Sequence, residues 1–286
     1  MINSDFVETI GSSVVQHGQF NNRAYLMKLD VNDVPGIIHE LDALVKRQGY
    51  TKVFAKAPAS QLPSFLDAGY RLEALVPGFF GGQEDGVFLG KYASFERSID
   101  PSADMIARNL EIAREKALAC PALELPEGIT IHHATEDDAD EMAGLYRAVF
   151  ASYPFPIYDS SYLRETMQSH IRYFCARFEG KIVALSSAEM DITASATEMT
   201  DFATLPQFSG KSLALLLLAH MERDPVVKEL HTAYTIARSL SPSMNVTFAR
   251  LGYALAGTLT LNTNISGNIE SMNVWHKSLG KQVSPS

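Results

Sequence analysis

One segment near residue 200 constrains the fold of this chain more than any other. A run of strand-forming residues from 196 to 205 ends at Pro206, a polar loop containing Gly210 follows, and the almost wholly apolar stretch from Leu213 to Met221 begins at once. A strand, a glycine loop and a helix in this order direct successive backbone N–H groups, together with the positive end of the helix dipole, at one anionic group such as phosphate. The segment therefore predicts an α/β fold with an anion-binding loop.

Composition and charge exclude several classes of protein. The chain has 286 residues, of which 46% are hydrophobic and 20% charged, as in ordinary globular proteins. Asp and Glu outnumber Lys and Arg by 33 to 24 without any basic run, so we expect no nucleic-acid partner. No apolar run is long enough for a membrane span, and the first residues lack the pattern of a secretory signal. Cys120 and Cys175 suit a reducing cytoplasm better than disulfides or zinc, so we expect a soluble, cytoplasmic protein without a metal.

Strand, helix and turn signals divide the chain into three parts. An N-terminal α/β domain over residues 1–97 has strand patterns at 24–29 and 52–57, a helix pattern at 34–47 and a hairpin pattern at 72–92. A linker helix and a turn occupy residues 98–128. The pattern of residues 129–286 predicts, in order, strand 129–133, helices 137–150 and 162–169, strands 173–178, 181–189 and 196–205, helix 212–223, strand 231–237, helix 242–251, and strands 254–262 and 271–277.

One short pattern occurs in both the first and the last part of the chain. Phe65-Leu-Asp-Ala-Gly69-Tyr70-Arg-Leu72 aligns with Phe248-Ala-Arg-Leu-Gly252-Tyr253-Ala-Leu255, and each follows a predicted strand. In both copies the pattern indicates a helix that ends at a glycine in the left-handed conformation, with an aromatic residue entering the next strand. We therefore expect the N-terminal part to repeat the second half of the C-terminal fold without its own cofactor loop, although any junction of this kind produces a similar pattern.

The loop and the order of elements resemble the Gcn5-related N-acetyltransferase superfamily, whose signature is Gln/Arg-x-x-Gly-x-Gly/Ala. Gln207-x-x-Gly210-x-Ser212 matches it except at the last position, where Ser212 is small enough to fit and is expected to cap the helix. The run from Asn245 to Tyr253 is similar to the superfamily's fourth helix. The resemblance implies an acyl-CoA N-acyltransferase fold, with a mixed central sheet flanked by helices, and acetyl-CoA as co-substrate. It places the acetyl-CoA contacts at Ala203, Thr204, Leu205, Gln207, Phe208, Ser209, Gly210, Lys211, Ser212, Asn245 and Phe248.

A second resemblance covers nearly the whole chain and involves the beta-lysine N-acetyltransferase family. The matching segments are Gln16-His17-Gly18, Asn21-x-Arg23-x-Tyr25, Phe54-Ala-Lys56, Gly69-Tyr70-x-x-Glu73 and Pro77-Gly78-Phe79-Phe80. This resemblance implies acetyl transfer to the terminal amine of beta-lysine, giving N6-acetyl-beta-lysine, a compatible solute. Acetylation of another small amine and binding of acyl-CoA as a sensor without turnover remain alternatives, and a homodimer is possible.

Acetyl transfer to an amine needs a group that removes the proton of an ammonium whose pKa is about 10. Glu198 is the leading candidate, since the resemblance to histone-modifying members of the superfamily places a Glu base at a comparable position; an ion-pair role stays open. Asp201 faces the opposite side of a regular strand unless a bulge intervenes, and Glu189 is a third candidate. Phe248 stands where relatives carry a tyrosine, so Tyr253 or Tyr234 is the candidate proton donor. No Cys or Ser stands out as an acyl carrier, which favours direct transfer in a ternary complex.

Recognition of beta-lysine also requires partners for a carboxylate and for a second amine. We expect the carboxylate to meet a cation among Arg23, Lys28 and Arg147, and the second amine to meet an acid among Glu73, Glu84 and Asp85. The sequence favours none of these strongly. Phe155, Tyr158 and the Phe79-Phe80 pair are candidates for the wall of an alkyl tunnel, although aromatic residues in such positions more often pack in the core.

Overall fold

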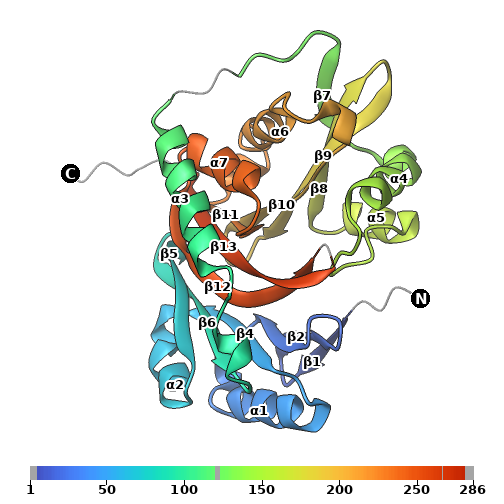
Figure 1. Cartoon of the computed structure of the whole chain (residues 1–286). Helices are drawn as coiled ribbons and strands as arrows, with labels where there is room; N and C mark the ends of the chain where they lie inside the picture. Colours follow the sequence, from blue (N-terminus) through green and yellow to red (C-terminus); the bar gives the residue numbers. More distant parts are fainter. Residues whose placement is uncertain (1–4, 120–122, 266, 281–286) are drawn as a thin grey trace, which may run out of the picture.

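The computed structural model describes residues 5–119, 123–265 and 267–280, so Cys120 and the first residues of the predicted turn lie outside the described part. Thirteen strands form one mixed sheet in the order β1-β2-β3-β4-β6-β5-β12-β13-β11-β10-β9-β8-β7. The N-terminal elements make up one end of this sheet and the C-terminal elements the other, and strands β5 and β12 meet at the junction (Figure 1).

The N-terminal half follows the predicted order and adds two strands at the edge of the sheet. Its two helices cover one face of the sheet, at the bottom of Figure 1. The prediction missed β1 and β2, which are short and carry no clean alternation. The elements are β1 (Phe6–Ile10), β2 (Ser13–Gly18), β3 (Arg23–Lys28), α1 (Gly36–Gln48), β4 (Lys52–Pro58), α2 (Leu62–Asp67), β5 (Arg71–Phe80) and β6 (Glu84–Tyr92).

The linker helix α3 (Ala103–Ala117) packs against α7 and is followed by the second half. Every strand and helix predicted between residues 129 and 278 is present, in the order that the acyltransferase fold requires, so the predicted fold is confirmed. The elements are β7 (Ile129–His133), α4 (Ala139–Val149), α5 (Ser160–Met167), β8 (Ile171–Phe178), β9 (Lys181–Asp191), β10 (Ala196–Thr204), α6 (Leu213–Met221), β11 (Thr232–Arg238), α7 (Pro242–Arg250), β12 (Ala254–Ile265) and β13 (Asn268–Ser278).

The two halves share the path β-α-β-α-β-β. Strand β3 pairs in parallel with β4, as β10 does with β11, and each parallel pair continues into an antiparallel hairpin, β5–β6 or β12–β13. The repeated sequence pattern has the same geometry in both copies. Gly69 and Gly252 have φ of 86° and 82°, and the ring centroids of the adjoining Phe–Tyr pairs lie 5.0 and 5.1 Å apart in edge-on contact. The division at residues 97 and 128 itself stays a prediction.

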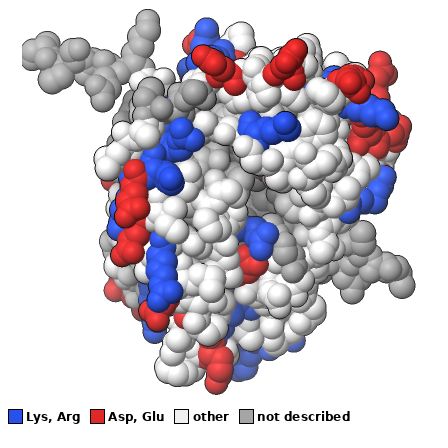
Figure 2. All heavy atoms as spheres, turned by 45° about the horizontal axis from the view of Figure 1, so that its top comes forward, with Lys and Arg blue, Asp and Glu red and all other residues white. Residues whose placement is uncertain are grey.

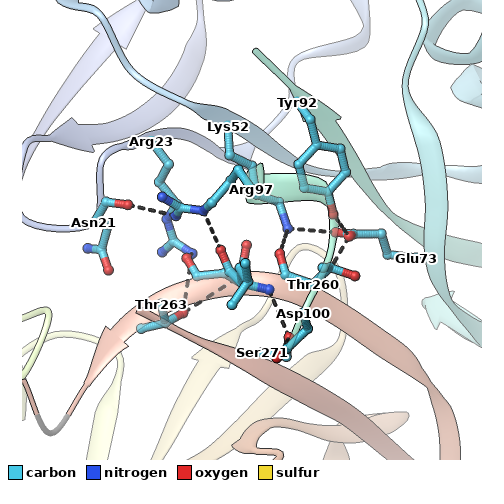
Figure 3. A network of polar contacts seen from close by, with 12 residues as sticks. Asn21, Arg23, Lys52, Glu73, Tyr92, Arg97, Asp100, Thr260, Thr263 and Ser271 are labelled. Carbon is cyan, nitrogen blue, oxygen red and sulfur yellow. Dashed lines mark hydrogen bonds and ion pairs between the residues drawn. The ribbon is translucent and has the colours of Figure 1, made fainter. Parts of the chain in front are cut away.

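The junction between the halves depends on a close approach of two backbones and on buried charges. A Cβ atom at Gly257 would lie 2.1 Å from the carbonyl oxygen of Glu73, so only glycine lets β12 reach β5 there. Beside it, the ammonium of Lys52 lies 2.9 Å from the Glu73 carboxylate and donates to the Thr260 carbonyl at 2.7 Å (Figure 3). Arg97 donates to the carbonyl oxygens of Leu261 and Asn21 at 2.7 and 2.8 Å. These bonds fix the orientation of the N-terminal half against strand β12.

Alternation along the N-terminal strands separates two faces. Residues such as Ala24, Leu26 and Val53 point toward α1 and α2, while Gln16, Arg23, Tyr25, Phe54 and Lys56 line a cavity on the other face. None of the helices in the described residues has the length and apolarity that a membrane span needs.

Candidate active site

A cavity of about 650 Å³ lies between the two halves. Strands β2, β3 and β4 supply one wall, β8 to β11 supply another, and the segment between α4 and α5 covers them with Phe150, Tyr153 and Phe155. Figure 2 shows a hollow in the middle of one face of the molecule, surrounded mainly by uncharged residues, with most of the charged side chains toward the edge of that face. Both halves of the chain are therefore needed to form the cavity.

Glu198 lies in the middle of the cavity wall, beside two groups that control its charge. In the sheet it stands directly opposite Glu189 of β9 on one side and Tyr234 of β11 on the other. Burial and the neighbouring Glu189 carboxylate raise the pKa of Glu198 to about 7, against the pull of Lys56 and a hydrogen bond with Tyr234. A carboxylate with a pKa near neutrality is suited to accept and release a proton.

The N-terminal half reaches this carboxylate through Lys56. The Lys56 ammonium donates to the hydroxyl of Tyr234 at 3.2 Å and lies 5.5 Å from the centre of the same ring. On the other side, His170 lies 3.6 Å from Glu189, which raises the pKa of the imidazole. Glu198 therefore belongs to a chain of polar side chains that crosses the cavity wall.

Asp201 reaches the cavity because strand β10 has a bulge. The register with β9 shifts between Thr200 and Ala203, so that Asp201 and Phe202 together occupy the space opposite one residue, and Asp201 has a φ of 56°. Its carboxylate accepts hydrogen bonds from the hydroxyls of Tyr153 and Ser187. Burial raises the pKa of Asp201 although these two bonds oppose the shift. Glu198 and Asp201 consequently line the same cavity.

Beyond Glu198 the two parallel strands separate. The described pairing of β10 with β11 covers only residues 196–198 and 232–234, and the cavity extends along β11 to Arg238. Leu205 donates its N–H to Val183 of β9 at 2.9 Å. Because successive N–H groups of a strand point to opposite edges, Thr204 directs its N–H into the gap beside β11, whereas the N–H of Leu205 is already used.

The predicted anion-binding loop is exposed, and its backbone takes the left-handed conformation at two positions, which is typical of anion-binding turns. Gly210 and Ser212 have φ of 78° and 58°, and, apart from its chain neighbours, no described residue lies within 4 Å of a Cβ atom placed on Gly210. The first bond of α6 runs from the N–H of Leu216 to the carbonyl of Ser212, which leaves the preceding N–H groups of the turn free to bind a ligand. The side chain of Ser212 makes no capping bond to a described residue, so that expectation is wrong: its backbone is left-handed, whereas a capping residue ordinarily has an extended backbone. Gln207, Ser209 and Lys211 are exposed beside this loop, and Phe208 is half-buried.

Of the predicted site residues, all of which the structure describes, Glu198, Asp201 and Phe248 line the cavity and the others lie outside it; Leu205, Gln207 and Phe208 line a separate, smaller pocket. Asn245 is fully buried and its amide is used by four internal bonds, two donated to the carbonyls of Arg238 and Ser241 and two accepted from Asn273 and Trp275. Tyr253 is buried in the core against Phe248 and does not line the cavity. Phe248 and Tyr234 do line it, whereas Ala203 is buried under α4. The structure therefore brings Tyr234, not Tyr253, to Glu198.

Among the candidate substrate-binding groups, Arg23 and Lys28 line the cavity. The other candidates bond elsewhere: Arg147 to the Tyr158 carbonyl, Glu84 to the N–H of Ser60, Asp85 to the N–H of Gly78, and Glu73 to Lys52. The sequence reasoning missed Gln16, Lys56, Tyr153 and His170 as cavity residues. Polar residues that alternate with apolar ones in strands β2 to β4 were the available signal, since one face of these strands packs on helices.

Known proteins provide an independent comparison. No protein-family model matches the chain. It is 37% identical over 268 residues to the beta-lysine N(6)-acetyltransferase of Methanococcus maripaludis, covering 94% of this chain and 97% of that protein. It is 31% identical over 259 residues to the protein of the same name from Methanosarcina mazei, covering 84% and 95%.

Among solved structures, the chain is similar to the ribosomal-protein-S18-alanine N-acetyltransferase of Escherichia coli. The TM-score is 0.47 at 12% identity, over 55% of this chain and 98% of that one. The two whole-length relatives, at 37% and 31% identity, are what decide the assignment. By these two relatives, the chain belongs to the beta-lysine N(6)-acetyltransferase family.

Proposed function

We propose that this protein transfers an acetyl group from acetyl-CoA to the terminal N6 amine of beta-lysine, by direct attack in a ternary complex. The observation that carries this proposal is the position of Glu198, a carboxyl group with a pKa of about 7 where the cavity enters the gap between β10 and β11. The product, N6-acetyl-beta-lysine, would serve as a compatible solute in the cytoplasm. A homodimer stays a prediction.

The residues present fit acetyl-CoA. The free N–H groups of the turn from Gly210 to Ser212 and the N-terminus of α6 suit the diphosphate, and the open space at Gly210 lets it approach the backbone. The N–H of Thr204 suits the pantetheine arm or the thioester carbonyl in the gap between the strands. Bound there, acetyl-CoA supplies an activated acyl group. Asn245 contributes through the packing of α7, because its amide is already hydrogen bonded.

Glu198 acts as the proton acceptor in this proposal. The attacking amine must lose its proton, and a carboxylate whose pKa lies near 7 holds that proton far better than an ordinary Glu. Tyr234 and Lys56 orient the carboxylate from the β11 side. Asp201, held by Tyr153 and Ser187, provides a second negative charge that attracts the ammonium form of the substrate into the cavity.

Thiol release from acetyl-CoA tests the proposal. The purified protein is offered beta-lysine, α-lysine, spermidine and an aminoglycoside, and the position of acetylation is determined by mass spectrometry. We expect beta-lysine to be turned over preferentially at N6. Preference for another amine would replace the substrate, and tight CoA binding without thiol release from any amine would favour the sensor function. Intact mass after incubation with acetyl-CoA alone must show no acetyl-enzyme; a stable adduct would overturn direct transfer.

A further inference from the structure

Arg23 is a buried cation that forms no ion pair with a carboxylate of the described residues, although the Asp5 carboxylate attracts it at longer range. Its side chain belongs to a residue that is only 4% exposed, and its guanidinium donates to the carbonyl of Asn262 at 2.5 Å and to the hydroxyl of Thr263 at 3.2 Å, both neutral groups (Figure 3). Among the ion pairs of the described residues, none involves Arg23, whereas Lys52 nearby is paired with Glu73. Buried charges in proteins are ordinarily paired, because the loss of hydration is costly.

Two buried donors of residues that line the cavity have no hydrogen-bond partner within the described part of the chain. The Nε atom of Arg23 and the Nε2 atom of Gln16, a residue that is 1% exposed, are both buried and make no hydrogen bond among the described residues. Gln16 stands opposite Tyr25 in the β2–β3 pair, and Tyr25 is two residues from Arg23, so the three side chains share the face that lines the cavity. An unsatisfied buried donor is unfavourable unless a ligand accepts a hydrogen bond from it.

The charges of the cavity are divided between its two walls. Arg23 lies on the N-terminal wall in a group of buried cations with Lys52 and Arg97; Glu73 is paired with Lys52, and the Asp5 carboxylate attracts Arg23 at longer range. The opposite wall carries acids on β9 and β10, namely Glu189, Asp191, Glu198 and Asp201. A ligand with an anionic and a cationic end therefore has one favoured orientation in this cavity.

We propose that Arg23 and Gln16 form the binding site for the substrate carboxylate, and that this site selects ω-amino acids over polyamines. The inference rests on the proposed function and names the specificity-determining residues of that site. Arg23 Nε and Gln16 Nε2 donate to the carboxylate, while the reacting amine lies toward Glu198. The unpartnered Oδ1 of Asn262, which also lines the cavity, accepts from the second ammonium next to the carboxylate.

The test compares beta-lysine with 1,4-diaminopentane, which is the same molecule without its carboxylate. We expect the wild-type kcat/KM for beta-lysine to be higher by about a hundredfold, since a buried charge pair is lost with the smaller amine. Arg23→Met should bring this ratio close to one by lowering the value for beta-lysine alone, mainly through KM. Gln16→Met removes a donor that makes no hydrogen bond to any described residue, so the fold should be retained and the ratio should fall about tenfold.

Arg97→Met is the matched control. Arg97 is another buried cation of the same network, but it does not line the cavity, so its loss should lower the melting temperature and leave the ratio unchanged. A wild-type enzyme that acetylates beta-lysine and 1,4-diaminopentane equally would overturn the carboxylate site and leave the proposed function intact. An equal loss of kcat/KM for both amines in Arg23→Met would also overturn the carboxylate site, because it would indicate a general structural role for Arg23.

A binding measurement keeps the inference separable from turnover. 6-Aminohexanoate should raise the melting temperature of the wild-type protein and of Arg97→Met, but not that of Arg23→Met, because a ligand stabilises only a fold that binds it. If no amine is acetylated, the proposed function fails, and this shift alone decides whether the carboxylate site exists. A wild-type protein that 6-aminohexanoate does not stabilise overturns the site.

Discussion

The two halves of this molecule follow the same path but differ where a helix begins after the first parallel strand. In the C-terminal half, the turn before α6 has no acidic residue and leaves its backbone N–H groups exposed. In the N-terminal half, Asp30 and Asp33 occupy the turn before α1, and the Asp33 carboxylate accepts from the N–H of Ser12 at 2.9 Å and from the hydroxyl of Ser13 at 2.7 Å. One turn is open to an anion, and the other already holds one.

The parallel strands show a matching difference. Strands β3 and β4 pair across residues 23–26 and 52–55, and Tyr25 stacks on Phe54 at 4.4 Å, where the C-terminal half places Glu198 beside Tyr234. The N-terminal half thus keeps the topology without a counterpart of Glu198 or of the open turn before α6, and supplies a wall of the cavity. A repeated fold therefore does not imply a repeated active site, because the site depends on a few side chains and one turn.

The largest loss of activity is expected on substitution of Glu198, and we expect no group on the N-terminal wall to have an effect of this size. Glu198→Gln should lower kcat by about 10²- to 10⁴-fold at pH 7, because the proton acceptor is lost. The wild-type kcat/KM should rise with pH through about 7 as Glu198 ionises, and this inflection should be absent from the variant, which high pH partly rescues. An unchanged pH profile would exclude Glu198 as the base.

The pH dependence of stability provides the control for Glu198→Gln, because it shows whether the variant remains folded. The folded-state pKa of Glu198 is raised, so the wild type loses stability as pH rises from about 4.5 to about 7, where the unfolded chain releases a proton that the folded chain retains. Glu198→Gln should therefore be more stable than the wild type at pH 8, by about 1–3 kcal/mol. Glu189→Gln removes a negative neighbour, so it should move the inflection to lower pH while activity is retained.

A second pair of variants compares the glycines of the two halves. Gly210, in the turn before α6, has a φ of 78°, and Gly49, after α1, has a φ of 69°. At both positions no described residue beyond the chain neighbours lies close to the place of a Cβ atom. Alanine at either site should cost about 1–2 kcal/mol of stability through backbone strain. Only Gly210→Ala should also raise the KM for acetyl-CoA, by about tenfold, as measured by thiol release at saturating amine. Equal KM values for the two variants would mean that the turn before α6 does not hold the diphosphate.

The smallest effect concerns the acidic turn of the N-terminal half. Hydrogen bonds from Ser13 and Ser12 hold the pKa of Asp33 below its usual value, so its contribution to stability is present at neutral pH and is lost as pH falls through the folded-state pKa. Asp33→Asn should lower the melting temperature slightly at pH 7, and the difference should vanish in acid. Thiol release should be unaffected; a change in KM for acetyl-CoA would show that the two turns are not separate in function.

The order of elements in the C-terminal half could be predicted because each one depends on local pattern. Each signal lies within about a dozen consecutive residues. The signals are the apolar run of α6, the glycines that follow α2 and α7, and the turn residues before α6. The repeat also appears in the sequence, since a left-handed glycine followed by an aromatic residue is a local requirement. The site could be predicted only in part. Glu198 and Asp201 were predicted and line the cavity, and the cofactor role of the turn before α6 stays a prediction. Lys56, Gln16 and His170 were missed because their elements lie far apart in the chain.

The sequence by itself determined the fold, the family and the turn before α6, because periodicity, glycine positions and loop chemistry act over short distances. Only the tertiary structure decided which side chains meet. The junction at Gly257 turns the polar face of β2 to β4 toward β9 and β10, and so places Lys56 beside Tyr234 and Arg23 in the cavity. Packing of α7 likewise engages the Asn245 amide in internal hydrogen bonds, and it leaves Tyr253 buried in the core. Long-range contacts of this kind depend on how two halves dock, which no local pattern specifies.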